Sequence, residues 1–147
     1  MPRIVREAVV VWEGTISRGA GVVEATSSGA FELPVTIASR VGDPEGKTSP
    51  EELLAAAHAT CYVTSLGSEL ARARTPPERL DVRCIITMDE VEGIGHRIVA
   101  SAMVASGVVP GCDAAAFALA AKAADEGCSF SALIRASATV TIDANLA

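Results

Sequence analysis

The clearest hydrophobic pattern in this chain is helical and lies in residues 48–73. Ser49 and Pro50 are typical of a helix start, and Glu52, three residues after Ser49, completes a capping box. The apolar positions recur every three to four residues, which predicts one buried face: Leu54, Ala57, Cys61 and Ser65, with Leu53, Leu66 and Leu70 beside them. This face is rich in small residues, so another backbone can approach it closely, and Cys61 lies in its middle.

Strands are predicted on both sides of this helix, because apolar and polar residues alternate there between turn signals. Pro34 in the third strand lacks a backbone N–H and indicates a sheet edge. A polar loop over residues 40–47 leads into the helix. The predicted strands cover residues 3–12, 22–26 and 31–37 before the helix, and residues 80–88, 96–105 and 136–142 after it.

A second Ala-rich helix is predicted over residues 113–126, with Asp113 as N-cap and Gly127 as its C-terminal stop. Residues 129–135 favour one or two further helical turns. Runs of strands separated by single helices indicate an α+β fold with largely antiparallel sheets, in one domain over residues 1–147. Both Ala-rich helices are too apolar to lie exposed, which favours a homodimer.

The composition narrows the possible partners and compartments. The formal net charge of −6 argues against nucleic acid or an anionic membrane surface as the main partner. We find no secretory signal at the start of the sequence and no run of about 18 apolar residues, so we expect a cytoplasmic protein that does not span a membrane.

Four cysteines and two histidines carry the candidate chemistry. Cys61, Cys84, Cys112 and Cys128 form no C-x-x-C pair, which gives a zinc site little support. A buried cysteine most often behaves as a small hydrophobe, and we assign that role to Cys84. Cys112 precedes a helix N-terminus, where a thiol pKa can fall, and receives no role.

The two histidines differ in their expected positions. His58 lies one turn before Cys61, so a Cys/His nucleophile pair is one interpretation. The sequence supplies no third group to orient the imidazole, and we therefore favour a core histidine. His96 lies in a predicted hairpin strand and should face solvent.

Four segments of the chain resemble the OsmC/Ohr family of peroxidases (osmotically inducible protein C and organic hydroperoxide resistance protein). The segments are TSPEELLAAAHATCY at 48–62, WEGTISRGAG at 12–21, VPGCDAAAF at 109–117 and GCSFSALIRA at 127–136. The resemblance covers nearly the whole chain. The AAHA segment at 56–59 and the WEG segment at 12–14 point to the OsmC branch.

The resemblance implies a fold and an activity. The fold would be an intertwined homodimer in which antiparallel sheets wrap around two long central helices, with active sites at the subunit interface. The activity would be reduction of hydroperoxides, organic ones preferred over hydrogen peroxide, by thiol chemistry without metal or flavin. Cys61 matches the peroxidatic position, Cys128 the resolving one, and Glu51 the carboxylate at the start of the helix.

The resemblance also implies an arginine near the thiol, and two positions could supply it. We favour Arg40, in the loop before the helix, and keep Arg18 as second choice. A thiolate attacks the peroxide O–O bond, so a guanidinium that stabilises the anion would counter the effect of burial. Glu51 could anchor that guanidinium, although a carboxylate at a helix N-terminus is favourable without any arginine.

Two other functions stay open. The same fold could be a binding or redox-sensing module that holds a hydrophobic ligand in an apolar pocket at the dimer interface; mere binding would not need the second cysteine. The four cysteines and two histidines could alternatively form a metal site. For the peroxidase, an external thiol or dithiol must serve as reductant.

Overall fold

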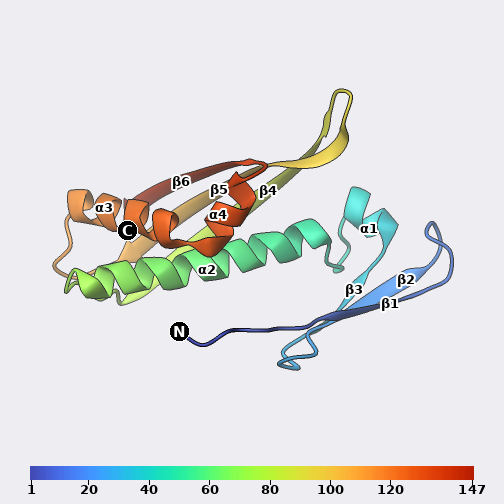
Figure 1. Ribbon diagram of the computed structural model, residues 1–147, viewed down its shortest axis with the longest axis horizontal. Helices are drawn as coiled ribbons and strands as arrows, with labels where there is room; N and C mark the ends of the chain where they lie inside the picture. The colour runs from blue at the N-terminus through green and yellow to red at the C-terminus, as the bar shows by residue number, and fades with distance from the viewer. The chain divides into compact units, whose positions relative to one another are not determined.

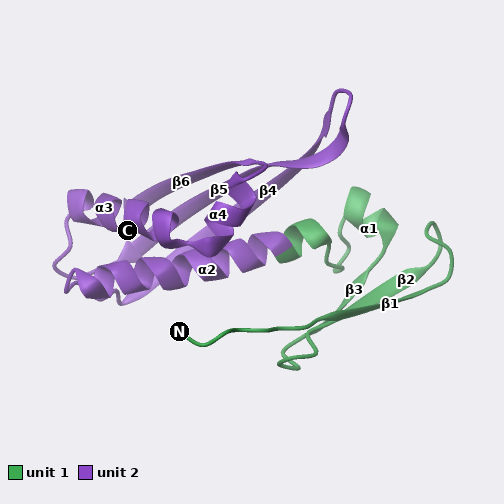
Figure 2. Cartoon of the chain, in the orientation of Figure 1, with its two compact units in different colours: residues 1–53 green, residues 54–147 purple.

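The computed structural model describes residues 1–147, and the chain forms two compact units, residues 1–53 and residues 54–147 (Figures 1 and 2). Each unit contains one three-stranded sheet. The first unit holds β1 (Val9–Glu13), β2 (Ala20–Glu24), β3 (Glu32–Val35), α1 (Ile37–Val41) and the start of α2 (Pro50–Arg72). The second holds the rest of α2 with β4 (Arg79–Val91), β5 (Gly95–Val108), α3 (Ala114–Gly127), α4 (Ser129–Arg135) and β6 (Thr139–Leu146).

The sheet of residues 1–53 is antiparallel in the order β1-β2-β3, which confirms the predicted hairpin and the edge position of Pro34. Its first strand is shorter than the predicted 3–12, because only residues 9–13 find partners on β2. Ile37 does not continue β3 as predicted. It begins α1, because the Thr36 hydroxyl caps that helix by accepting from the Ser39 N–H at 3.1 Å. Arg40 therefore lies in a short helix rather than in a loop.

Helix α2 begins as predicted, with one difference at its cap. The Ser49 hydroxyl accepts from the backbone N–H of Glu52 at 3.1 Å. The Glu52 carboxylate does not complete the predicted capping box with Ser49. It accepts instead from the hydroxyl of Thr48 at 2.8 Å, an alternative partner one residue earlier.

The fully buried face of α2 is rotated by one residue from the predicted stripe. It consists of His58, Tyr62, Leu66 and Leu70. The Tyr62 hydroxyl donates to the carbonyl of Ala121 in α3 at 3.0 Å, so this face meets α3. Cys61 is consequently half-buried at the margin of the face, where a second side chain can reach it.

The sheet of residues 54–147 has the order β4-β5-β6. Strands β4 and β5 form the predicted hairpin, but β6 runs parallel to β5, so this sheet is mixed rather than antiparallel. The parallel pairing follows from the helices α3 and α4, which form the crossover that a parallel connection needs. Cross-strand neighbours Cys84, Met103 and Ile142 share the face that packs in the core.

Helix α3 starts at its predicted cap, where Asp113 Oδ1 accepts from the Ala116 N–H at 2.8 Å. The helix runs one residue further than the predicted 113–126, so Gly127 lies inside it rather than just after it. Gly127 is the last helical residue, and Cys128 serves as C-cap of α3 and N-cap of α4. The junction therefore fixes Cys128 between two helices that lie beside the sheet (Figure 1). No helix of the chain has both the length and the apolar character that crossing a membrane requires.

Candidate thiol site

Two sulfurs meet where α4 begins. The Sγ atoms of Cys61 in α2 and Cys128 lie 3.2 Å apart, and the Cys128 thiol donates a hydrogen bond to Cys61. No disulfide joins the two cysteines. A disulfide S–S bond measures about 2.05 Å, so a movement of about 1 Å would bring the two sulfurs to bonding distance.

The surroundings of Cys61 favour its thiolate. Burial acts to raise the pKa of Cys61, but hydrogen bonds from the Cys128 thiol, the backbone N–H of Phe130 and the Ser129 N–H and hydroxyl outweigh it. The pKa of Cys61 therefore lies below its ordinary value of 9.0. The Ser129 hydroxyl is 3.9 Å from the sulfur. Backbone N–H groups that are free in the first turn of a helix are good donors to an anion.

The surroundings of Cys128 favour its thiol. Its side chain is 1% exposed, and this burial raises the pKa of Cys128 above 9.0. The backbone N–H of Ser131 donates to its sulfur at 3.5 Å, which opposes the rise without cancelling it. The two pKa values therefore shift in opposite directions, that of Cys61 downward and that of Cys128 upward.

Arg40 and Glu51 form an ion pair within residues 1–53. The Nη2 of Arg40 donates to Glu51 Oε1 at 2.7 Å, and Nε donates to both carboxylate oxygens at 3.2 and 3.3 Å. These hydrogen bonds lower the pKa of Glu51 and raise the pKa of Arg40. Glu51 is in the first turn of α2, ten positions before Cys61. The pairing of Glu51 with Arg40 that the sequence analysis favoured is therefore present, and the role of Arg40 at the thiol stays a prediction.

Arg18, the second-choice arginine, lies in the turn between β1 and β2. Its backbone N–H donates to the Thr15 hydroxyl at 3.2 Å. The turn requires glycine at position 19, because a Cβ there would lie 2.4 Å from the carbonyl oxygens of Glu13 and Thr15. Glu51 pairs with Arg40 and not with Arg18.

His58 is fully buried, as expected for a core histidine, and makes no hydrogen bond to Cys61. Its Nδ1 lies 2.7 Å from the Ser101 hydroxyl, and its Nε2 lies 2.8 Å from the Ser131 hydroxyl. Sequence reasoning missed both serines, because they come from β5 and α4, and no local pattern links them to α2. Burial lowers the pKa of His58, which keeps the imidazole neutral at pH 7.

The remaining candidates take no part in the sulfur pair. Cys84 packs at the margin of the core as predicted, with its sulfur 3.3 Å from the Ser101 hydroxyl. Cys112 donates to the carbonyl of Asp113 at 3.5 Å, and His96 is exposed as predicted. No three His, Cys, Asp or Glu side chains are grouped to hold a metal ion.

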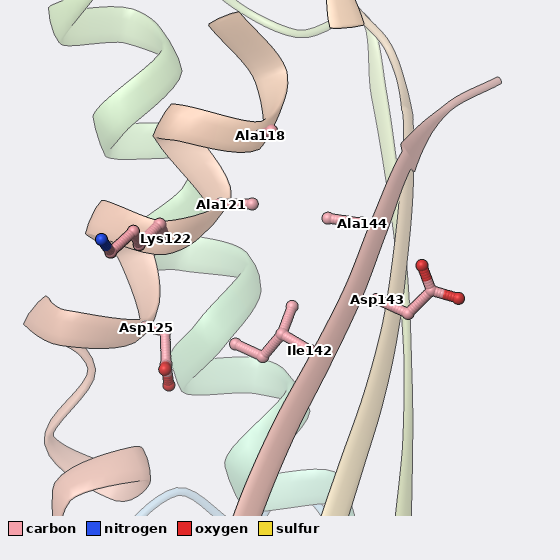
Figure 3. A pocket seen from close by; sticks show the side chains of 7 residues that line it. All are labelled: Ala118, Ala121, Lys122, Asp125, Ile142, Asp143 and Ala144. Atoms are coloured by element: carbon pink, nitrogen blue, oxygen red, sulfur yellow. The ribbon is translucent and has the colours of Figure 1, made fainter. Parts of the chain in front are cut away.

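A pocket of about 430 Å³ lies between α3 and β6, and neither Cys61 nor Cys128 lines it. Figure 3 shows Ala121 and Ala144 pointing toward one another across it, with Ile142 beside them. The rest of the pocket lining includes the charged side chains of Lys122, Asp125 and Asp143. The pocket is thus a feature separate from the sulfur pair.

Comparison with known proteins agrees with the fold and identifies the family. Residues 42–143, more than half of the chain, match the family model described as OsmC-like protein. The chain belongs to this family. It is 34% identical over 129 residues to the peroxiredoxin OsmC of Escherichia coli (strain K12), and the match covers 88% of this chain and 89% of that protein.

Solved structures share the fold. An organic hydroperoxide resistance protein OsmC from Legionella pneumophila superposes with a TM-score of 0.77 at 20% identity, covering 97% of this chain and 99% of that one. The organic hydroperoxide resistance protein OhrB of Bacillus subtilis gives a TM-score of 0.74 at 19% identity, covering 95% of this chain and 98% of that one. At these identities the likeness concerns the fold.

Proposed function

We propose that this protein is a thiol peroxidase that reduces organic hydroperoxides with Cys61 as the attacking thiolate and Cys128 as the resolving thiol. The observation that carries the proposal is the 3.2 Å sulfur pair, in which Cys128 donates to Cys61. The pKa of Cys61 is lowered and that of Cys128 is raised, and these directions support an attacking role for Cys61 and a resolving role for Cys128. The 34% identical relative is named a peroxiredoxin, which supports the same activity.

The reaction follows from these states. The Cys61 thiolate attacks the peroxide O–O bond, takes one oxygen to become a sulfenic acid, and releases the alcohol once the alkoxide gains a proton. Cys128 then attacks the Cys61 sulfur, a disulfide forms, and the sulfenic oxygen leaves as water. An external thiol or dithiol reduces the disulfide by exchange and restores both thiols. No step calls for a metal or a flavin.

Arg40 and Glu51 are proposed to assist the first step. A guanidinium is always charged and can stabilise both the thiolate and the negative charge that builds on the leaving oxygen. Glu51 holds Arg40 through two of its nitrogens, so the orientation of the planar group is restricted. Arg18 remains the second choice for this role.

The substrate, assembly and compartment are also proposals. Organic hydroperoxides are favoured over hydrogen peroxide, because burying an alkyl chain against apolar side chains gains about 0.8 kcal/mol per CH₂. An intertwined homodimer is supported by the valines that the sheet of residues 1–53 exposes in the single chain: Val9, Val10, Val11 and Val22. We place the protein in the cytoplasm, where thiol reductants are abundant.

Substitution of each cysteine tests the proposal with cumene hydroperoxide and dithiothreitol. Cys61→Ser should abolish turnover, a loss of at least about a thousandfold, because the weakly acidic hydroxyl cannot replace the thiolate. Cys128→Ser should allow one turnover, followed by over-oxidation of Cys61. Cys112→Ser is the matched control and should keep the wild-type rate. Activity retained by Cys61→Ser would refute the proposal.

The alternative is a binding or redox-sensing module. The pocket between α3 and β6 favours it, since its alanines and Ile142 could accept an apolar group. A purified protein that leaves cumene hydroperoxide intact, yet carries a stoichiometric lipid-like molecule by native mass spectrometry, would support this alternative over the peroxidase.

A further inference from the structure

A buried chain of hydrogen-bonding groups connects His58 to the resolving cysteine. His58, Ser101 and Ser131 come from α2, β5 and α4, and the side chain of each is 0% exposed. The Nε2 of His58 lies 2.8 Å from Ser131 Oγ. Ser131 in turn donates its backbone N–H to Cys128 Sγ at 3.5 Å. The Ser131 hydroxyl also acts on this thiol and opposes the rise of its pKa. The groups therefore run in the order Cys128 Sγ, Ser131 Oγ, His58 Nε2.

The resolving step creates a need for such a chain. Cys128 must lose a proton when it attacks the Cys61 sulfenic acid, yet the residue is only 1% exposed, so a direct transfer to bulk water is disfavoured. In an in-line displacement the leaving oxygen stands opposite the attacking sulfur. The thiol proton therefore cannot pass directly to the leaving oxygen, and a separate acceptor on the Cys128 side is required.

We propose that His58 is a positioning residue that accepts the proton of Cys128 through the Ser131 hydroxyl as the disulfide forms. This inference rests on the proposed function. The sulfur–sulfur bond forms as the Cys61 S–O bond breaks. The hydroxide gains a proton from solvent at half-buried Cys61 and leaves as water, while the thiol proton passes to Ser131 and the Ser131 proton to Nε2. The imidazolium loses this proton again before the next cycle, so the sum is one thiol and one sulfenic acid giving one disulfide and one water.

The hydrogen bonds of His58 suit this role. A neutral imidazole has one donor and one acceptor nitrogen, and Ser101 at 2.7 Å from Nδ1 can accept from an Nδ1–H. That tautomer leaves Nε2 free to accept from Ser131. The sequence offered no group that would orient the imidazole, and the two serines supply that orientation.

The charges around His58 keep it neutral and ready to accept. Burial has the largest effect and lowers the pKa of His58 below its ordinary value of 6.5, while Asp125 of α3 raises it and Arg135 of α4 lowers it. Asp125 and Arg135 form an ion pair at 2.7 Å, so their opposite effects on the pKa of His58 largely cancel. The Cys84 thiol of β4, 3.9 Å from Nδ1, is the other titratable group at the ring, and burial raises its pKa, which keeps it neutral.

The experiment separates the two steps by rapid quenching and intact-mass analysis after one equivalent of cumene hydroperoxide. Dimedone trapping reports formation of the Cys61 sulfenic acid, and loss of water reports disulfide formation, each followed from pH 5.5 to 9. In the wild type, the rate of disulfide formation should be nearly constant from pH 7 to 8.5. It should decrease at pH values below 6.5, where His58 becomes protonated.

His58→Gln keeps hydrogen-bonding capacity but cannot accept a proton. It should slow disulfide formation about a hundredfold at pH 7, within the range known for general bases. Its rate should then rise about tenfold per pH unit up to pH 9, because the reaction must wait for the free Cys128 thiolate. Sulfenic acid formation should stay within twofold of wild type. The exposed His96 supplies the matched control, His96→Gln, with both steps unchanged.

Ser131→Ala is the second variant, in case His58→Gln does not fold, and it keeps the backbone N–H while removing the hydroxyl. In Ser131→Ala the rate of disulfide formation should rise about tenfold per pH unit, as in His58→Gln. If the variants keep the wild-type pH profile, or slow both steps equally, His58 is a structural residue only and the inference is wrong. If the wild type itself forms no sulfenic acid, the proposed peroxidase function fails, an outcome visible in the first step alone.

Discussion

Residues 54–147 bury their apolar side chains far more completely than residues 1–53 do. Twelve of the fourteen buried apolar residues lie in the second unit, and Val23 and Ala25 are the two in the first. The first unit instead exposes Val10 and Val11 at 58% and 56% in the single chain. A three-stranded sheet with so little buried surface is marginal by itself.

The same division separates the two sets of functional groups. The sulfur pair and its hydrogen bonds lie wholly in residues 54–147, around a packed core. The cation and its carboxylate anchor, Arg40 and Glu51, lie in residues 1–53. We infer that the nucleophile is held by internal packing, whereas the unit that carries the cation depends on a second chain for its stability.

Truncation of a core side chain should give the largest loss of stability. Leu66→Ala removes a side chain that is 0% exposed, and we expect it to lower the free energy of unfolding by about 3 kcal/mol. Val11→Ala, on the exposed sheet, should cost less than about 0.5 kcal/mol in the monomer. Urea unfolding of both variants at low protein concentration measures the difference. Equal losses of unfolding free energy in the two variants would contradict the difference in burial between the two units.

Loss of the cation should give the next largest effect. Arg40→Ala should reduce kcat/KM for cumene hydroperoxide about a hundredfold, which corresponds to about 2.7 kcal/mol of transition-state stabilisation. Arg40→Lys should recover only part of this loss, because a lysine cannot reproduce the two-nitrogen pairing with Glu51. Arg18→Ala should stay within about threefold of wild type. If Arg18→Ala lost more kcat/KM than Arg40→Ala, the role would belong to Arg18.

A charge on the exposed sheet should weaken the homodimer. Val10→Asp would place a carboxylate among the valines of β1 and β2, and we expect the dissociation constant of the dimer to rise at least tenfold, about 1.4 kcal/mol. Sedimentation velocity over a range of concentrations gives this constant. Lys122→Asp, in α3 of the other unit, is the control. An unchanged constant would place the interface elsewhere, and a monomeric wild type would remove the dimer proposal.

The smallest effect concerns the Arg40–Glu51 pair and pH. Arg40 lowers the pKa of Glu51 below its ordinary value of 4.5. The stabilisation is therefore complete above pH 4.5 and is lost as the pH falls through the lowered pKa. Because the pair is partly exposed, we expect it to contribute less than about 1 kcal/mol to the free energy of unfolding. Urea titrations between pH 3 and 6 should show this slope in the wild type and not in Glu51→Gln.

The sequence predicted most features that depend on local patterns. The start of α2, the β4–β5 hairpin and the Asp113 cap are signals within a few residues, and each was correct. Helix α1 was missed because Ile37 continues an alternating pattern, while the competing signal is a capping box formed by Thr36 and Ser39. Periodicity placed Cys61 on the helix, whereas the roles of Cys61, Cys128, Arg40 and Glu51 came from the family resemblance and stay predictions.

Features that depend on distant contacts could not be predicted. The buried face of α2 was placed one residue away, because Tyr62 was not recognised as a core residue and the position of α3 decides which side is covered. The parallel register of β6 depends on the path of α3 and α4 over the sheet. Ser101 and Ser131 lie 43 and 73 residues from His58, and no sequence signal connects them.

The most direct test of the central claim is an intact-mass and free-thiol measurement on the wild type after one equivalent of cumene hydroperoxide. We expect a loss of two hydrogens, two fewer free thiols, and a peptide in which Cys61 is linked to Cys128. An unchanged mass with both thiols still free would refute the peroxidase proposal and leave the binding module as the better description.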